Sequence, residues 1–214
     1  MSITYRRSRV EDCSGVRAVA ESLAFASLSA SGIDAAALSS SGFLLYPLEA
    51  DSTQAPNYHE RIEASEHFWV AENQARIVGF VMAYTFDCMA RLLHKTPNDL
   101  ATLEHFITRM RTRGSIIYLA QAGVLPDHQR RGIYSALIRH AFDSVDGTDH
   151  PALIAEIAQF PLWNQSSTLA ALETGFSPVF LRDKPGHPPT ESRLSATFMK
   201  SLPCRRPLTN PIRC

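Results

Sequence analysis

Residues 124–134 read VLPDHQRRGIY and connect the end of a predicted strand to the start of a predicted helix. The first backbone N–H groups of a helix have no partner inside it, and the helix dipole adds partial positive charge at the same end. Gly132 lets a ligand approach that backbone closely, and Arg130 and Arg131 add two full positive charges. These features predict a site for a diphosphate. The charge and the glycine alone are equally consistent with a solvated turn whose arginines face water.

Apolar residues on both sides of this stretch follow strand and helix periods in turn. The order predicts an α/β (α+β) chain with one mixed central sheet of about six to seven strands, flanked by helices. Asp12 is expected to cap the first helix, and Gly175 to end the last one. The expected strands cover residues 2–6, 67–72, 77–86, 115–124, 153–157, 179–182 and 194–199, and the expected helices cover residues 12–24, 56–66, 98–114, 133–142 and 166–174, with a loop and a short helix over 29–43.

The domain organisation is read as one domain over residues 1–200, followed by a flexible tail over 201–214. The tail is rich in proline and arginine, a composition that does not favour a packed core. No linker or repeat divides the rest of the chain. A length of 214 residues is enough for one domain with a proper core.

The composition argues against several classes of protein. Lys+Arg and Asp+Glu are equal at 21 each, so the basic excess typical of nucleic-acid binding is missing. The longest apolar run, residues 116–120, is far too short to cross a bilayer, and the first 12 residues do not resemble a signal peptide. The 4 cysteines are scattered and the 8 histidines show no ligand spacing. We therefore expect a cytoplasmic protein without a metal site and without a nucleic-acid or membrane partner.

Three sequence elements carry a resemblance to a known family. Gln129–Tyr134 looks like the Q/R-x-x-G-x-G/A signature of GNAT acetyltransferases, and Ala122–Pro126 is similar to the V-A-V-x-P that leads into it. Downstream, Asn164 and Ser167 precede Gly175-Phe176 at the spacing of the family's N-x-x-(S/A)-…-G-F element. The motifs cover about 60 residues and the element order about 200, and together they indicate the family more strongly than any one alone.

The resemblance implies acetyl-coenzyme A as acyl donor and a fold in which two parallel central strands splay apart. The pantetheine arm would pair with the free backbone of Ala122, Gly123 and Val124, much as an added strand does. Asn164 would reach the pantetheine amides, with Ser167 at the small-residue position; the alternative for Asn164 is a simple loop cap. The diphosphate would lie on the backbone of Gln129, Arg130, Arg131, Gly132, Ile133 and Tyr134.

The sequence departs from the family pattern at three places. Tyr134 stands where Gly or Ala is usual, so its side chain must turn away from the diphosphate. Ala171 occupies the position of a tyrosine that protonates the leaving thiolate in many members. The central strand has no glutamate, so Glu156 on the next strand is the candidate general base and Tyr118 a candidate catalytic or pocket residue. Glu156 can equally be a surface or salt-bridged residue, and Tyr118 a core residue.

Gln121 and His67 are further candidates for the wall of the acceptor pocket. The long segments 27–66 and 88–114 are expected to shape that pocket, because insertions at these places commonly do so in the family.

The function predicted from these features is that of an acyltransferase, an N-acetyltransferase that moves an acetyl group from acetyl-coenzyme A to a primary amine by direct attack. The acceptor would be a small-molecule amine, an amino acid or a peptide. The alternative is a non-catalytic module of the same fold that binds acyl-coenzyme A as a sensor or interaction partner. One edge of such a sheet can also pair with a second copy, so a homodimer is a further expectation.

Overall fold

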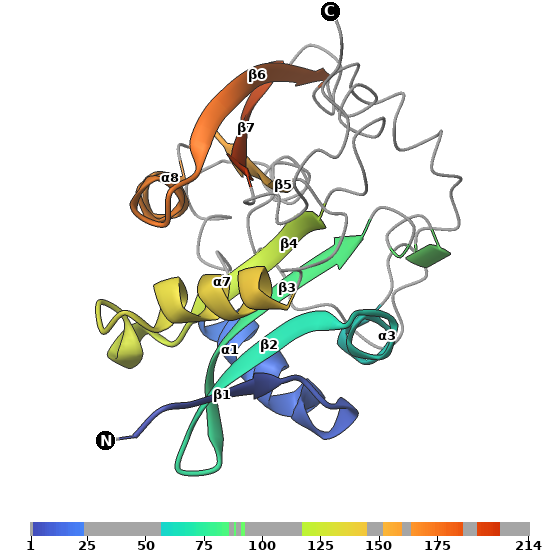
Figure 1. The fold of residues 1–214 in the computed structure, drawn as a ribbon, viewed down its shortest axis with the longest axis vertical. Coiled ribbons are helices and arrows are strands. Elements are labelled where there is room, and N and C mark those ends of the chain that lie inside the picture. The colour runs from blue at the N-terminus through green and yellow to red at the C-terminus, as the bar shows by residue number, and fades with distance from the viewer. Residues whose placement is uncertain are drawn as a thin grey trace, which may run out of the picture.

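The computed structural model describes residues 2–23, 57–85, 88, 91–92, 117–144, 152–159, 164–185 and 192–201. Figure 1 shows these parts as a sheet with helices on both of its faces. In chain order the elements are β1 (Thr4–Arg7), a 3-10 turn η1 (Val10–Asp12), α1 (Cys13–Leu23), α3 (Tyr58–Ala64), β2 (His67–Asn73), β3 (Arg76–Thr85), β4 (Ile117–Val124), a 3-10 turn η3 (Pro126–His128), α7 (Ile133–Asp143), β5 (Ala152–Ala158), α8 (Gln165–Glu173), β6 (Ser177–Pro185) and β7 (Ser192–Ser201).

The seven strands form one sheet in the order β1-β2-β3-β4-β5-β7-β6. Within this sheet, β4 and β5 are the parallel pair, and the other neighbours are antiparallel. Parallel strands need a crossover connection, and α7 lies in the chain between β4 and β5. The predicted α/β domain with a mixed central sheet is therefore confirmed.

The helices α1 and α7 cover opposite faces of the sheet. A Cβ on Gly79 of β3 would lie 3.3 Å from Cδ1 of Leu137 in α7, whereas a Cβ on Gly123 of β4 would lie 2.6 Å from Cδ1 of Leu23 in α1. Figure 1 shows the same arrangement, with α7 in front of the sheet and α1 behind it. The α7 face also receives α8, and the α1 face receives α3.

Local sequence explains the turns and helix starts that the periodicity predicted. Gln74 and Ala75 both have positive φ, 50° and 61°, as a tight hairpin turn between β2 and β3 requires. At the start of α3, Asn57 Oδ1 accepts from the Glu60 N–H at 3.0 Å, and Glu60 Oε2 accepts from the Asn57 N–H at 2.9 Å. This reciprocal capping box fixes where the helix predicted over 56–66 begins.

The prediction that the Asp12 side chain caps the first helix is wrong, because its hydrogen bonds go to Arg6 and Arg9. Asp12 immediately precedes α1, but its carboxylate accepts from the Arg9 N–H at 2.8 Å and from two nitrogens of Arg6 at 2.7 and 2.8 Å. Arg6 also donates to Glu72 of β2 at 2.6 Å. The carboxylate therefore serves the start of η1, one turn before α1, and is held there by the charged partner from β1.

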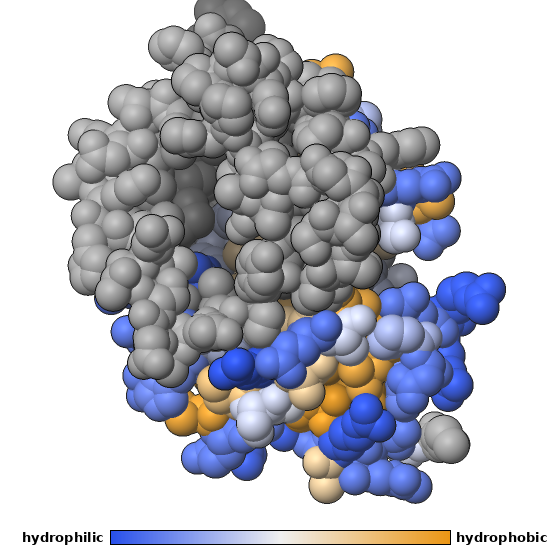
Figure 2. All heavy atoms as spheres, turned by 180° about the vertical axis from the view of Figure 1, so that it is seen from behind, coloured by the Kyte–Doolittle hydropathy of each residue, from blue (hydrophilic) through white to orange (hydrophobic). Residues whose placement is uncertain are grey.

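Some expectations fall outside the described residues, namely the helix over 98–114, the segment 29–43 and residues 202–214 of the predicted tail. Ser201, the first residue of that tail, still belongs to β7. Among the described residues, no helix is both long enough and apolar enough to span a membrane. Seen from behind, the lower part of the surface carries hydrophobic side chains bordered by hydrophilic ones (Figure 2).

Candidate functional site

The two parallel strands β4 and β5 are joined over a short stretch only. Their register pairs Ile117–Leu119 with Leu153–Ala155, and β5 pairs with no residue of β4 from Ala120 to Val124. The central strands therefore part after Leu119, as the predicted splay requires. No described strand pairs with the β5-facing backbone edge of β4 over Ala120–Val124, and such an unpaired edge is the kind that an extended ligand can join as an added strand.

A β-bulge lies at the point where the two strands part. On the other side of β4, Ala83 pairs with Leu119 and Met82 with Gln121, so that Ala120 has no partner on β3. Bulges re-aim the side chains and backbone groups that follow them. After the bulge Gln121 faces α3, where its Oε1 accepts from the Tyr58 hydroxyl at 3.1 Å.

The turn after β4 is held by hydrogen bonds of Leu125, His128 and Gln129. The Leu125 N–H donates to the Val78 carbonyl at 2.9 Å, and Gln129 Nε2 donates back to the Val124 carbonyl at 3.0 Å. His128 bridges Asp127, at 2.9 Å from Nδ1, and Asn73 of the β2–β3 hairpin, at 3.3 Å from Nε2. The bond to His128 lowers the pKa of the Asp127 carboxyl. The loop is thus fixed to both β3 and the hairpin.

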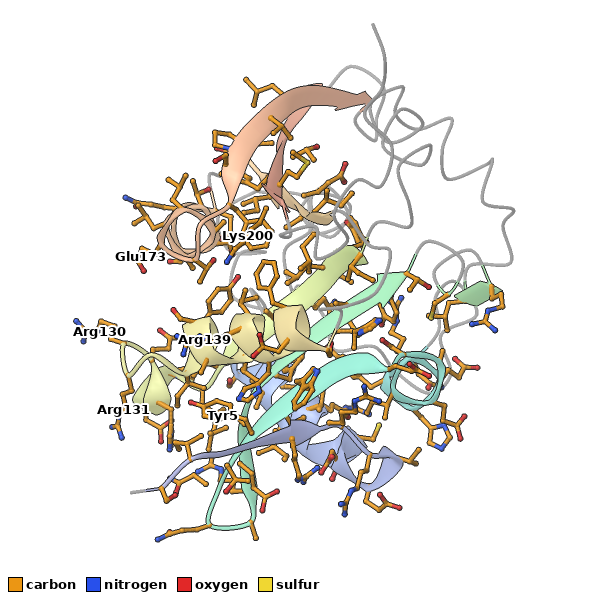
Figure 3. All side chains as sticks on the ribbon, in the orientation of Figure 1. Tyr5, Arg130, Arg131, Arg139, Glu173 and Lys200 are labelled. Carbon is orange, nitrogen blue, oxygen red and sulfur yellow. The ribbon has the colours of Figure 1, made fainter. Side chains whose placement is uncertain are left out.

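The N-terminus of α7 is exposed and has no side-chain cap. Gly132 is its N-cap residue in the left-handed conformation, with φ of 75°, and a Cβ added there would meet no atom within 4 Å. Arg130 and Arg131 precede it, both exposed, and neither forms an ion pair with a residue that the structure describes. Figure 3 shows both side chains extending outward from the loop. Unpaired positive charge, uncapped N–H groups and open space therefore coincide, which suits an anion.

Ile133 and Tyr134 place their side chains inward. Ile133 is 2% exposed in the core, and Tyr134 packs against the same core while remaining partly buried. Burial raises the pKa of the Tyr134 hydroxyl to about 12. The bulky residue in place of the usual Gly or Ala therefore leaves the space above the helix N-terminus open.

Asn164 acts as the N-cap of α8. Its Oδ1 accepts from the Ser167 N–H at 3.1 Å, which is the loop-cap alternative named for it in the sequence. The Ser167 N–H is thereby engaged within the protein. Ala171, at the position of the family's tyrosine, is 3% exposed and packs in the core. Its methyl side chain has no proton to donate to a leaving thiolate.

Beyond Leu119 the strands β4 and β5 part, and we call this place the opening. Polar side chains of β4, β5 and β7 lie there on the face of the sheet that α3 covers. Tyr118 pairs with Ile154, and in adjacent strands such partners point to the same face. Glu156, two residues later on β5, shares that face and is the first residue beyond the last β4–β5 pair. Thr197 of β7 is the cross-strand partner of Glu156. Tyr118 and Glu156 are both partly buried. The structure therefore brings the two candidate catalytic residues to one face of the opening.

His67 does not belong to this group. Its strand neighbour Trp69 stacks on His140 of α7 at 5.0 Å, so His67 faces α7 as well. Its Nδ1 lies 2.9 Å from Oγ of Ser144, just after that helix. His67 is thus a buried residue of the face opposite to Tyr118 and Glu156, apart from the two candidate catalytic residues.

Sequence reasoning missed two residues of the α3 face, Tyr58 and Thr197. Both are 1% exposed. In the sequence Tyr58 is surrounded by polar residues, and Thr197 lies between the apolar Ala196 and Phe198. Their link to the site comes from a hydrogen bond across 63 residues and from strand register, and neither is visible in a linear pattern.

A surface hollow and the distribution of possible metal ligands add nothing to this site. A surface hollow of about 390 Å³ is lined by α1, the β2–β3 hairpin and Leu125, and by no residue of β5 or of the loop 129–134. The described residues contain no group of three or more His, Cys, Asp or Glu side chains that could hold a metal ion.

Comparison with known proteins agrees with this geometry. A model of the acetyltransferase (GNAT) family matches residues 37–159, more than half of the chain. The chain belongs to the acetyltransferase (GNAT) family. The GNAT match includes the loop 129–134 and ends before Asn164. A search of curated proteins found no match to the chain.

Several solved GNAT structures share the fold. The polyamine N-acetyltransferase of Drosophila melanogaster is similar with a TM-score of 0.60 and 14% identity, over 94% of this chain and 100% of that chain. yncA from Salmonella typhimurium, solved with its cofactor acetyl-CoA, is similar with a TM-score of 0.56 and 16% identity, over 100% of both chains. The ribosomal-protein-S18-alanine N-acetyltransferase from Escherichia coli is similar with a TM-score of 0.54 and 12% identity, over 98% of this chain and 99% of that chain.

Proposed function

We propose that this protein is an N-acetyltransferase that moves an acetyl group from acetyl-coenzyme A to a primary amine by direct attack. The observation that carries the proposal is the parting of β4 and β5 beside the uncapped, doubly basic N-terminus of α7. An open strand edge suits an extended amide-containing arm, and the helix terminus suits a diphosphate. Coenzyme A has these two parts in sequence.

In this proposal the diphosphate is held by the backbone of residues 129–134 and by the charges of Arg130 and Arg131. The Gly132 position, which is open to at least 4 Å, gives the phosphates access to the N–H groups. The pantetheine arm pairs with β4 over Ala122–Val124. The Val124 carbonyl already accepts from Gln129, and a carbonyl oxygen has a second lone pair for the arm.

Asn164 supports the arm from the other side of the opening. Its Oδ1 is used by the α8 cap, which leaves the side-chain NH₂ as the group that can donate to a pantetheine carbonyl. Ser167 lies in the first turn of α8, and its small side chain leaves room for the arm to approach Asn164.

The thioester would then lie near the bulge at Ala120. Backbone amides between the bulge and Val124 stabilise the negative charge that develops on the carbonyl oxygen. The acceptor approaches from the α3 face, where Glu156 and Tyr118 lie. Glu156 takes a proton from the ammonium, directly or through one water, and Tyr118 helps to position the amine.

The steps balance without a further reactant. The ammonium loses one proton to Glu156, and its nitrogen bonds to the thioester carbon. The tetrahedral intermediate collapses with cleavage of the C–S bond, its second nitrogen proton passes to water, and Glu156 later returns its own proton to solvent. The coenzyme A thiolate leaves and takes a proton from solvent, since Ala171 has none to give.

The proposed class of acceptor follows from the reaction, which needs an amine, and from the names of two structural neighbours. Two structural neighbours act on polyamines and on the alanine of ribosomal protein S18 by their names. Both substrates present a primary amine. A small-molecule amine, an amino acid or a peptide terminus is therefore the first panel to test.

Turnover over that panel, followed by thiol release, tests the proposal. Acetyl-coenzyme A binding with amine-dependent thiol release supports it, and binding without turnover by any amine contradicts it. The second outcome would favour a non-catalytic acyl-coenzyme A module, which the buried Ala171 in place of a proton donor also favours.

A further inference from the structure

Thr197 of β7 carries a polar group that the proposed mechanism leaves unused. The residue is 1% exposed, and its Oγ1 has no hydrogen-bond partner among the residues that the structure describes. An unsatisfied buried hydroxyl costs about 1–3 kcal/mol, and valine would fill the same volume without that cost. A buried hydroxyl without a partner in the described part of the chain is therefore a candidate for a hydrogen bond to a bound substrate.

The position of Thr197 indicates what that partner is. Thr197 lies directly across the β5–β7 pair from Glu156, so the two side chains share a face with Cβ atoms about 5 Å apart. Glu156 is the first residue of β5 beyond its last pair with β4, at Ala155. The hydroxyl and the carboxylate thus lie together where the central strands part.

The chemistry proposed for this opening needs a hydrogen-bond acceptor next to the base. A primary ammonium has three N–H bonds, and one proton leaves to Glu156 before attack. The nitrogen lone pair must then face the thioester carbon, so the two remaining N–H bonds point away from it and need acceptors. A threonine oxygen can accept one of them.

We infer that Thr197 Oγ1 accepts a hydrogen bond from the acceptor's amino group beside Glu156, orients its lone pair for attack and selects primary over secondary amines. The inference rests on the proposed function. Selectivity follows because a deprotonated primary amine has two N–H bonds to donate, one of them to Thr197 Oγ1. A deprotonated secondary amine has only one N–H bond, so one of the two hydrogen bonds made by the primary amine is lost. A site built to bind an N–H group rejects an analogue that lacks it.

The test compares Thr197→Val and Thr197→Ser, using a primary amine substrate and its N-methyl analogue. Thr197→Val should lower kcat/KM for the primary amine about tenfold and narrow its advantage over the N-methyl analogue, while Thr197→Ser keeps both. The affinity for acetyl-coenzyme A should not change. The melting temperature of Thr197→Val should be equal to or above that of wild type, because an unsatisfied hydroxyl is removed.

A matched control is Thr174→Val. The Thr174 hydroxyl donates to the carbonyl of Ala170 at 2.7 Å within α8, so its loss should lower the melting temperature and leave the amine kinetics unaltered. Thr197→Ala, which also lacks the hydroxyl, must show the same kinetic loss if the valine variant folds poorly.

The inference is overturned if the variants without the Thr197 hydroxyl keep the wild-type kcat/KM and amine selectivity while the wild type turns over. Failure of the wild type to acetylate any amine would overturn the proposed function and this inference together.

Discussion

Gln129 donates its side-chain amide to the Val124 carbonyl at 3.0 Å, and so ties the loop before α7 to the last residue of β4. Val124 belongs to the edge proposed for the pantetheine arm, and Gln129 opens the stretch proposed for the diphosphate. One hydrogen bond therefore fixes the spacing between the two halves of the coenzyme site. The sequence motif alone gave Gln129 no such role.

Replacement of this link should weaken coenzyme binding more than it weakens the fold. Gln129 is exposed, and a single neutral hydrogen bond contributes about 1 kcal/mol, so Gln129→Ala should raise the Kd for acetyl-coenzyme A about fivefold. Calorimetric titration measures the affinity, and thermal unfolding measures the fold. A large loss of stability with unchanged affinity would contradict the assignment.

Gly132→Ala tests the backbone at the start of α7. The residue has φ of 75° and open space around its Cβ position, so the alanine should cost about 1 kcal/mol through backbone strain alone. The added methyl group also lies over the N–H groups proposed for the diphosphate, so the affinity for acetyl-coenzyme A should fall.

Gly175→Ala is the matched control for this change. Gly175 has φ of 85°, and its Cβ would make only ordinary contact with Lys200 at 3.6 Å. The two variants should lose similar stability in urea unfolding, and only Gly132→Ala should bind acetyl-coenzyme A less tightly. Equal affinity for acetyl-coenzyme A in both variants would show that the N-terminus of α7 does not bind the coenzyme.

Glu156→Gln should lower the rate of acetyl transfer by about a hundredfold, because a general base typically contributes 10²–10⁴-fold. The affinity for acetyl-coenzyme A should stay the same, since the carboxylate faces the acceptor. Glu173→Gln, an exposed glutamate on α8, is the control of equal charge change. An unaltered rate in Glu156→Gln would assign the proton transfer to another group.

Asp12→Asn tests the ion-pair network that joins β1, β2 and the start of α1. Burial by itself raises the pKa of the Asp12 carboxyl, but the hydrogen bonds from Arg6 and from the Arg9 N–H outweigh it and lower the pKa overall. A lowered pKa in the folded state means that the contribution is full above the unfolded value of about 3.9 and is lost as pH falls through the folded pKa.

Wild type should therefore be more stable than Asp12→Asn by about 2 kcal/mol at neutral pH. The difference should narrow below about pH 4, where the unfolded chain begins to bind the proton. Urea unfolding at several pH values measures it. A difference that is constant down to pH 2 would show that the charge of Asp12 is not the cause.

The order of the elements could be predicted from the sequence because most helices and strands carry their own periodicity and end signals. The helix expected over 133–142 is Ile133–Asp143, and the strand expected over 153–157 is Ala152–Ala158. The basic turn before Gly132 was visible for the same reason, since all its parts are close in the chain.

Relations between distant residues could not be predicted in the same way. A single extra residue, Ala120, changes the side of the sheet that the preceding part of β4 faces, and no local pattern marks such a bulge. The pairing of Glu156 with Thr197 depends on the register between two strands whose paired residues are 41 positions apart in the chain. The side of the sheet that His67 faces depends on the same kind of information. Asp12 failed as the cap of α1 because its carboxylate binds Arg6 of β1, which also binds Glu72 of β2.

The proposed function depends on the binding of the acetyl-coenzyme A diphosphate by the loop 129–134. Calorimetric titration of the wild type and of the Arg130→Gln/Arg131→Gln double variant tests it most directly, with the exposed pair Arg7→Gln/Arg9→Gln as a control of equal charge change. We expect micromolar binding by the wild type and the control, and a loss of affinity of at least about thirtyfold in the loop variant. Equal affinity in all three proteins, or no binding by the wild type, would contradict it.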